Sequence, residues 1–231
     1  MSGFALLHGA FRGGWAWDRV ARHLRDGGHV VATPDLVPAH AVTAGSAMTL
    51  DDLVRPIVAA VDRVSGEVGA PVTLAGHSLG GFLARVAAED CADRLSELVY
   101  LDAPVPVDGD RAYGFPGREA VPPDVDPDTW VDPPPVSAGE RMSADDARWI
   151  TERLRPEPMG PSLEIVRLDS RTVAAIPVRH LFFSGTPEFM PCAVTRVRLD
   201  ADRMPYDLID AGHDGIVTAA AQVADWLALT G

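Results

Sequence analysis

Residues 71–90 read PVTLAGHSLGGFLARVAAED, and the rest of the fold can be worked out from this segment. A short apolar run, 71–75, leads into GHSLG at 76–80, and a helical pattern covers 78–90. The motif G-x-S-x-G is typical of a tight strand-to-helix turn that projects a serine hydroxyl above the sheet, and its glycines admit the strained backbone. Ser78 is therefore the candidate nucleophile, with a purely structural serine turn as the alternative.

The same alternation of strand and helix extends in both directions along the chain. Short apolar runs predict the strands 4–7, 29–33, 71–75, 97–101, 178–183 and 205–209. Helical spacing of apolar residues predicts the helices 15–25, 49–64, 78–90 and 215–229. Strands that are separated by crossover helices pair in parallel. We therefore expect an α/β fold whose mostly parallel sheet has about six strands and helices on both faces.

A proline-rich stretch interrupts this alternation after the fourth predicted strand. Nine of the 32 residues in 104–135 are proline, which can neither donate to a sheet ladder nor continue a helix. We interpret 105–176 as an inserted cap or lid, and 1–104 together with 177–231 as the core.

Two further helices are predicted inside the cap, at 143–154 and 162–168. A disordered linker is the alternative interpretation of this segment. The cap is favoured because the segment holds apolar anchors that a solvated linker would not need, namely Phe115, Trp130 and Trp149.

Composition and charge exclude several classes of function. The 231 residues carry 33 acidic and 20 basic side chains, and this net charge of −13 argues against nucleic-acid and membrane partners. All the basic residues are Arg, so neither a Schiff-base lysine nor a P-loop lysine is available. Cys91 and Cys192 are too few for a disulfide framework or a thiolate metal site, and we expect no metal and no cofactor. Without a signal-peptide pattern or a long apolar run, a cytoplasmic location is expected.

Four segments spread along the chain resemble a known family: HGAFRGGWAW at 8–17, GHSLGG at 76–81, LVYLDA at 98–103 and AGHD at 211–214. In them the chain resembles the α/β-hydrolases, in particular the compact group of plant methylesterases, hydroxynitrile lyases and their bacterial relatives. The resemblance implies the α/β-hydrolase fold and a triad in the chain order serine, acid, histidine. It does not extend to a motif in the cap.

A serine hydroxyl needs a base to take its proton, and His213 is the candidate base. It follows the last predicted strand, in a glycine-flanked loop at the sheet edge where Ser78 also lies. His8 and His77 also belong to the site, at positions that resemble loop-supporting residues of the family, and we interpret them as supports. The remaining histidines are interpreted as structural or surface residues: His23, His29, His40 and His180.

The candidate acid departs from the usual family pattern. Family members most often place this acid after the strand that corresponds to 178–183, where the present chain reads SGTPE at 184–188 with Thr186 near the expected position. Asp102, at the end of the fourth predicted strand, is our candidate because it fits the chain order. It also resembles the acid position of certain haloalkane dehalogenases and lactone hydrolases. Glu188 is the fallback acid, and a strand-end carboxylate that fixes the local loop is the structural alternative for Asp102.

Acyl transfer also needs backbone N–H donors that stabilise the oxyanion. The elbow supplies one donor from Leu79. The resemblance assigns the second to the backbone of Ala10 and places Phe11 in the acyl pocket.

These residues predict a serine hydrolase that cleaves a small ester, thioester or lactone through an acyl-enzyme, most simply a carboxylic ester hydrolase. The alternatives are a lyase, cyclase or acyl-eliminating enzyme, in which His213 acts as acid and base while Ser78 positions substrate, and a noncatalytic small-molecule binding protein. Hydroxynitrile lyase activity is disfavoured, because those relatives depend on a cap lysine and this chain has no lysine.

Overall fold

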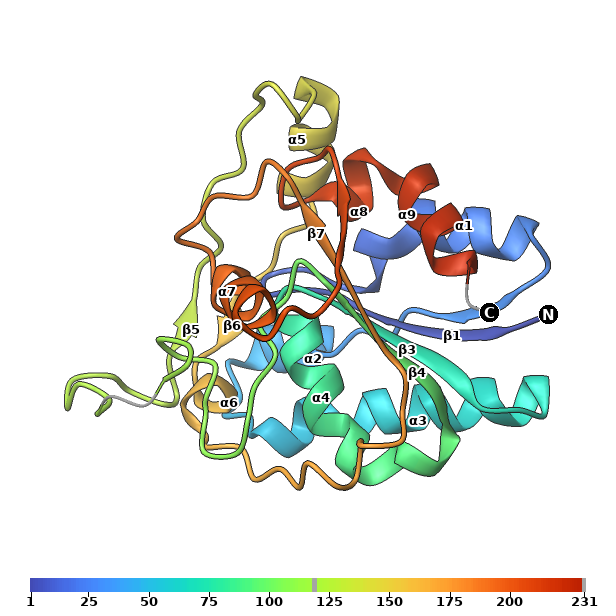
Figure 1. Cartoon of the computed structure of the whole chain (residues 1–231). Helices are drawn as coiled ribbons and strands as arrows, with labels where there is room; N and C mark the ends of the chain where they lie inside the picture. The colour runs from blue at the N-terminus through green and yellow to red at the C-terminus, as the bar shows by residue number, and fades with distance from the viewer. Residues whose placement is uncertain (118–119, 230–231) are drawn as a thin grey trace.

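The structure is a computed structural model that describes residues 1–117 and 120–229. Its main sheet is six-stranded and parallel throughout, with the strand order β2-β1-β3-β4-β7-β8 (Figure 1). The strands are β1 (Gly3–Leu7), β2 (Val30–Ala32), β3 (Val72–His77), β4 (Leu95–Leu101), β7 (Val178–Phe183) and β8 (Asp207–Ile209). The predicted α/β fold with its parallel sheet is therefore confirmed.

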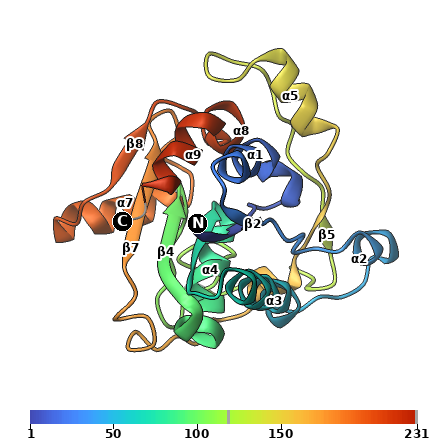
Figure 2. The same ribbon diagram turned by 90° about the vertical axis from the view of Figure 1, so that its right-hand side faces the viewer.

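Helices cover both faces of this sheet, as the two views show (Figures 1 and 2). One face carries α1 (Asp18–Asp26) and α9 (Ala220–Ala228), which pack against each other. The other face carries α3 (Leu50–Val68) and α4 (Leu79–Cys91). None of the described helices is both long enough and apolar enough to cross a membrane.

A separate apolar core lies on each face of the sheet. Side chains alternate between the faces of a strand, and in β1 this alternation places Phe4 and Leu6 in the core beneath α1 and α9. Ala5 and Leu7 belong to the core beneath α3 and α4. All four side chains are fully buried, so the near-continuous apolar run of β1 is the pattern expected of a strand covered on both faces.

Several helices depart from the predicted ones. A 3₁₀ turn, Gly14–Trp17, precedes α1, and another, Ala92–Arg94, follows α4. The predicted closing helix divides at Ala219 into α8 (Gly215–Thr218) and α9, although the apolar spacing runs on across the break. Two helices were not predicted, α2 (Ala39–Ala44) and α7 (Cys192–Asp202).

The segment 105–176 leaves the sheet after β4 and passes over its carboxyl edge (Figure 1). It contains β5 (Trp130–Val131), α5 (Ala144–Thr151), β6 (Glu157–Pro158) and α6 (Gly160–Leu163), with β5 and β6 paired antiparallel. Ile150 and Val166 are buried, so the described part packs against the core. The division into a cap, 105–176, and a core remains a proposal. Within these ranges, 118–119 and 230–231 lie outside the described residues.

The helix predicted over 162–168 is wrong beyond Leu163, where α6 ends. Val166 instead exchanges backbone hydrogen bonds with the preceding part of the cap. Its N–H donates to the Asp110 carbonyl at 2.9 Å, and its carbonyl accepts from the Gly109 N–H at 3.1 Å. These contacts satisfy the backbone of Val166 without a helix, and local spacing alone cannot reveal them.

The approach of α4 to the strand ends requires glycine at two positions. A Cβ on Gly76 would lie 2.2 Å from the Gly80 carbonyl oxygen, and a Cβ on Gly80 would lie 2.5 Å from the Leu7 carbonyl oxygen. Both obstacles are backbone atoms, which cannot move aside as a flexible side chain would. The glycines of the motif therefore permit the close contact between β1, β3 and α4.

We predict that Gly80→Ala lowers the free energy of unfolding by about 1–3 kcal/mol, because the added methyl group overpacks this contact. Gly66→Ala, in the exposed part of α3 where a Cβ meets nothing within 4 Å, is the matched control and should stabilise by up to about 1 kcal/mol through helix propensity. Urea unfolding of both variants measures the difference. Equal stability of the two variants would contradict the importance of this close packing.

Candidate active site

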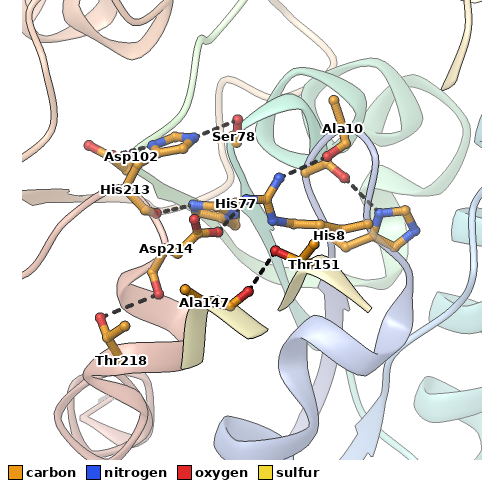
Figure 3. Close-up of polar contacts among 12 residues, drawn as sticks. His8, Ala10, His77, Ser78, Asp102, Ala147, Thr151, His213, Asp214 and Thr218 are labelled. Atoms are coloured by element: carbon orange, nitrogen blue, oxygen red, sulfur yellow. Dashed lines mark hydrogen bonds and ion pairs between the residues drawn. The ribbon is translucent and has the colours of Figure 1, made fainter. Parts of the chain in front are cut away.

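Ser78 stands at the turn between β3 and α4 with an unusual backbone. Its φ of 54° and ψ of −127° are rare for a residue with a side chain. Its N–H donates to the Leu101 carbonyl of β4 at 3.1 Å, which fixes the turn against the neighbouring strand. The hydroxyl is thereby presented at the carboxyl edge of the sheet (Figure 3).

His213 lies in the loop between β8 and α8, and its ring bridges the other two predicted triad residues (Figure 3). Its Nε2 is 3.0 Å from Ser78 Oγ, and its Nδ1 is 2.6 Å from Asp102 Oδ2. A tautomer with the proton on Nδ1 donates to the carboxylate and leaves Nε2 free to accept from the hydroxyl. The geometry is that of a general base beside a nucleophile.

Asp102 follows β4 and is 1% exposed. Its side chain accepts from the Phe183 N–H at 3.3 Å and from the Thr186 hydroxyl at 2.5 Å, in addition to its contact with His213. Burial alone would raise the pKa of Asp102, but the hydrogen bonds and charge of His213 and the Thr186 hydroxyl hold that pKa below its ordinary value. The carboxylate form that orients an imidazole is therefore favoured.

The alternative acid, Glu188, lines a small cavity together with Asp102 and Thr186. Its side chain is exposed. The Nδ1 of His213, which the triad acid would bind, is already bonded to Asp102. Thr186, at the position where relatives most often carry the acid, donates to Asp102 instead. The sequence shows that Thr186 lies near the expected acid position, but it did not predict the hydrogen bond from Thr186 to Asp102.

We predict that Asp102→Asn lowers kcat by about 10⁴-fold, because an amide favours the wrong imidazole tautomer, as in the analogous serine proteases. Glu188→Gln is the matched control and should change kcat by less than about 2-fold, since the Glu188 side chain is exposed and surface substitutions have small effects. Steady-state ester hydrolysis checks both. Comparable losses in the two variants would contradict the assignment of the acid.

His77 is buried beside His213, and His8 is buried directly after β1; both were predicted as supporting residues. The Nε2 of His77 lies 2.7 Å from the His213 carbonyl, a contact that holds the loop of the candidate base. His8 lies between the Gly9 carbonyl, 2.9 Å from its Nδ1, and the Leu36 N–H, 3.1 Å from its Nε2. These two partners fit the neutral ring, which donates from one nitrogen and accepts at the other.

Burial lowers the pKa of His8 to about 4 and that of His77 well below its ordinary value; the charges of His213 and Arg12 lower the pKa of His77 further. The unfolded chain binds a proton at these rings near pH 6.5, whereas the folded chain does so only at lower pH. Stability that depends on the neutral rings is therefore complete above pH 6.5 and is lost as the pH falls toward 4.

We predict that the free energy of unfolding falls between pH 6.5 and pH 4, by about 3 kcal/mol from His8 alone. Urea titrations across this range measure the slope. His8→Gln, which keeps one donor and one acceptor, should have a shallower slope, while His40→Gln on the exposed surface should follow the wild-type curve. A wild-type stability that is constant over this range would contradict the expected linkage.

The loop 8–12, which we call the oxyanion loop, lies against Ser78. A Cβ on Gly9 would be 2.9 Å from Ser78 Cβ, so the loop passes close to Ser78. Ala10 follows Gly9 in this loop, and Leu79 is the first residue of α4. Both predicted oxyanion donors thus belong to the segments that flank Ser78.

Side chains of other elements hold this loop. Arg12 donates to the Ala10 carbonyl at 3.0 Å and pairs with Asp214, next to His213, at 2.5 Å. From β6, Glu157 accepts the Phe11 N–H at 2.7 Å. The contacts of Glu157 with Phe11 and of Arg12 with Asp214 were not predicted from the sequence, because no local pattern signals a partner 146 or 202 residues away.

A small apolar cavity of about 10 Å³ adjoins the elbow. It is lined by Leu50, Leu53, Leu79, Phe82, Leu83, Ala112, Pro161 and Ser162, which come from α3, α4 and the cap. A cavity of this size has room for about one water molecule. Phe11, predicted to line an acyl pocket, is half-buried in the oxyanion loop and does not line this cavity.

Asp102, Cys192 and His213 each offer a potential metal ligand, with donor atoms within 4.8 Å of one another. Burial and the neighbouring carboxylate of Asp102 raise the pKa of the Cys192 thiol to about 12, so without a bound cation this thiol is protonated. Both ring nitrogens of His213 also have protein partners. This donor set fits a hydrogen-bonded triad better than a metal centre.

Comparison with known proteins places this geometry in context. Residues 4–226 match the model described as the Alpha/beta hydrolase family. Over 127 residues the chain is 37% identical to the carbendazim hydrolyzing esterase of Nocardioides sp. (strain SG-4G), which covers 54% of this chain and 51% of that protein. Over 132 residues it is 29% identical to methylesterase 7 of Arabidopsis thaliana, covering 56% and 49% respectively. The chain spans about half the length of the curated relatives it matches.

The fold as a whole is similar to that of a polyneuridine aldehyde esterase mutant. The two structures superpose with a TM-score of 0.79 over 100% of this chain and 99% of the other, at 17% identity. At that identity the likeness concerns the fold alone. The family match and the relatives confirm the predicted resemblance to α/β-hydrolases and methylesterases.

Proposed function

Because the chain belongs to the alpha/beta hydrolase family, we propose that it is a carboxylic ester hydrolase that cleaves small esters through an acyl-enzyme on Ser78. The observation that carries the proposal is the chain of contacts from Ser78 Oγ through His213 to Asp102, at 3.0 and 2.6 Å. The names of the relatives, a carbendazim hydrolyzing esterase and a methylesterase, support an ester substrate.

In the proposed reaction, Ser78 Oγ attacks the ester carbonyl carbon while its proton passes to His213 Nε2. The buried Asp102 stabilises the imidazolium that forms. His213 then returns the proton to the leaving alcohol as the carbon–oxygen bond breaks, leaving the acyl group on Ser78. Water, deprotonated by the same histidine, releases the acid and restores the serine.

Negative charge develops on the carbonyl oxygen during both steps. The backbone N–H groups of Leu79 and Ala10 are the proposed donors to this oxyanion, and preorganised donors of this kind contribute about 3–4 kcal/mol each. The positive end of the α4 dipole adds to their effect, since α4 begins directly after the nucleophile.

The cavity beside Leu79 is the observation that favours a substrate with a short apolar group. Its lining is almost entirely apolar, and its volume of about 10 Å³ leaves little space. A larger acyl or alcohol group would need a displacement of α6, which supplies Pro161 and Ser162 to the lining. We therefore propose short-chain esters as the first substrates to assay.

We predict that a fluorophosphonate labels the wild-type protein stoichiometrically at Ser78, as mapped by mass spectrometry of the digested chain. Ser78→Ala should lose the label and lower kcat for short-chain ester hydrolysis by about 10⁶-fold, as removal of the nucleophile does in a serine protease. The fold should survive, because one oxygen at the sheet edge is removed.

Ser65→Ala is the control, since Ser65 is a half-buried serine of α3 that bonds the Ala70 carbonyl. It should keep both label and activity. A wild-type protein without an adduct on Ser78, or a Ser78→Ala variant as active as the wild type, would refute the acyl-enzyme. Binding without labelling or turnover would instead favour the noncatalytic binding protein.

A further inference from the structure

A buried carboxyl group of the cap contacts the oxyanion loop. Glu157 lies on β6, where it pairs with Val131 of β5, and it is 8% exposed. Its Oε2 accepts the backbone N–H of Phe11 at 2.7 Å. Two residues earlier, the backbone N–H of Arg155 donates to the Phe11 carbonyl at 3.0 Å. The segment 155–157 thus binds both peptide groups of Phe11.

These two contacts hold Phe11 in an unfavourable backbone conformation. Its φ is 65°, in the left-handed region that residues with a side chain rarely adopt. Such a conformation persists only where the surroundings over-determine it. Here one peptide group is fixed by the Glu157 carboxyl and the next by the Arg155 N–H, so the rotation between them is fixed as well.

The fixed peptide adjoins the proposed oxyanion donor. The carbonyl of Ala10 and the N–H of Phe11 belong to one planar peptide group. Arg12 binds the carbonyl side at 3.0 Å, and Glu157 binds the N–H side. With this plane held at both ends, the backbone of Ala10 has little freedom to turn its own N–H away from the oxyanion.

We propose that Glu157 is a positioning residue for the oxyanion loop, which it holds in the catalytic conformation by accepting the Phe11 N–H. The inference rests on the proposed function, because an oxyanion forms at this loop only if Ser78 attacks a carbonyl group. It assigns to the cap a part in organising the catalytic groups of the core, in addition to covering them.

The charge of Glu157 is compatible with this role. Burial raises its pKa to about 7, against the opposing effects of the Phe11 N–H and the Arg12 guanidinium. Near neutral pH the carboxyl is therefore ionised for only part of the time. An oxygen acceptor without a full negative charge repels a developing oxyanion less than a permanent carboxylate would.

Three substitutions separate the acceptor from the charge. Glu157→Gln keeps the length and an oxygen acceptor, Glu157→Asp keeps the carboxyl group but is one methylene shorter, and Glu157→Leu removes the acceptor. Glu164→Leu is the matched control, because Glu164 is an exposed cap carboxylate that accepts the Leu50 N–H at 2.6 Å, away from the oxyanion loop.

Activity is measured as kcat per active site, with active sites counted by the fluorophosphonate label on Ser78. A purely structural role would lower the labelled fraction and the melting temperature but not the turnover of each labelled site. We expect Glu157→Leu and Glu157→Asp to lower kcat per site by about 10- to 100-fold, with KM within about 3-fold, because a displaced donor weakens the transition state selectively. Glu157→Gln and Glu164→Leu should stay within about 3-fold of wild type.

A Glu157→Leu variant with wild-type turnover per site would overturn the proposal, as would a Gln variant as impaired as the Leu variant. If the Leu variant does not fold, the Asp variant takes its place, and wild-type turnover in the Asp variant overturns the proposal. Failure of the proposed function has a different signature, since the wild-type protein itself would then show neither label nor hydrolysis.

Discussion

The close approach of α4 to the ends of β1 and β3 is the constraint on which the rest of the structure depends. Gly76 and Gly80 leave no room for a side chain between the helix and the strand ends. The helix therefore begins immediately after β3, and Ser78 is fixed at the junction between them. Because Gly80 meets Leu7, the last residue of β1, the same contact brings the loop 8–12 to Ser78.

Strained backbone is concentrated around this junction. Among the described residues other than glycine, positive φ angles occur at Phe11, Ser78, Asp102 and Arg203, and the first three surround the candidate site. Each such conformation costs on the order of 1–3 kcal/mol. The cost is offset by hydrogen bonds to neighbouring elements, from Ser78 to β4, from Asp102 to β7 and from Phe11 to the cap. Rigid neighbours are thus a condition for placing these side chains.

The sequence was most informative where local pattern and tertiary position agree. Continuous apolar runs identified the buried strands. The elbow motif, together with the fact that parallel strands end at one edge of a sheet, predicted that Ser78, Asp102 and His213 lie at the same edge.

Helix α7 was not predicted because its burial is weak, with Val197 66% exposed. The division of the closing helix at Ala219 carries no sequence signal. The partners of Asp102 and Phe11, Thr186 and Glu157, lie 84 and 146 residues away, and spacing does not encode contacts of that range.

The presence of two apolar cores on opposite faces of the sheet determines how the protein loses activity on heating. Ser78 directly precedes α4, whose buried face belongs to one core, while His213 precedes α8, whose Ile216 and Val217 belong to the other. Parts of a protein can open separately, each with its own free energy. The bond between Ser78 and His213 spans both layers and so survives only while both are closed. Inactivation on heating would then follow the weaker layer, even while the stronger one still preserves most of the secondary structure.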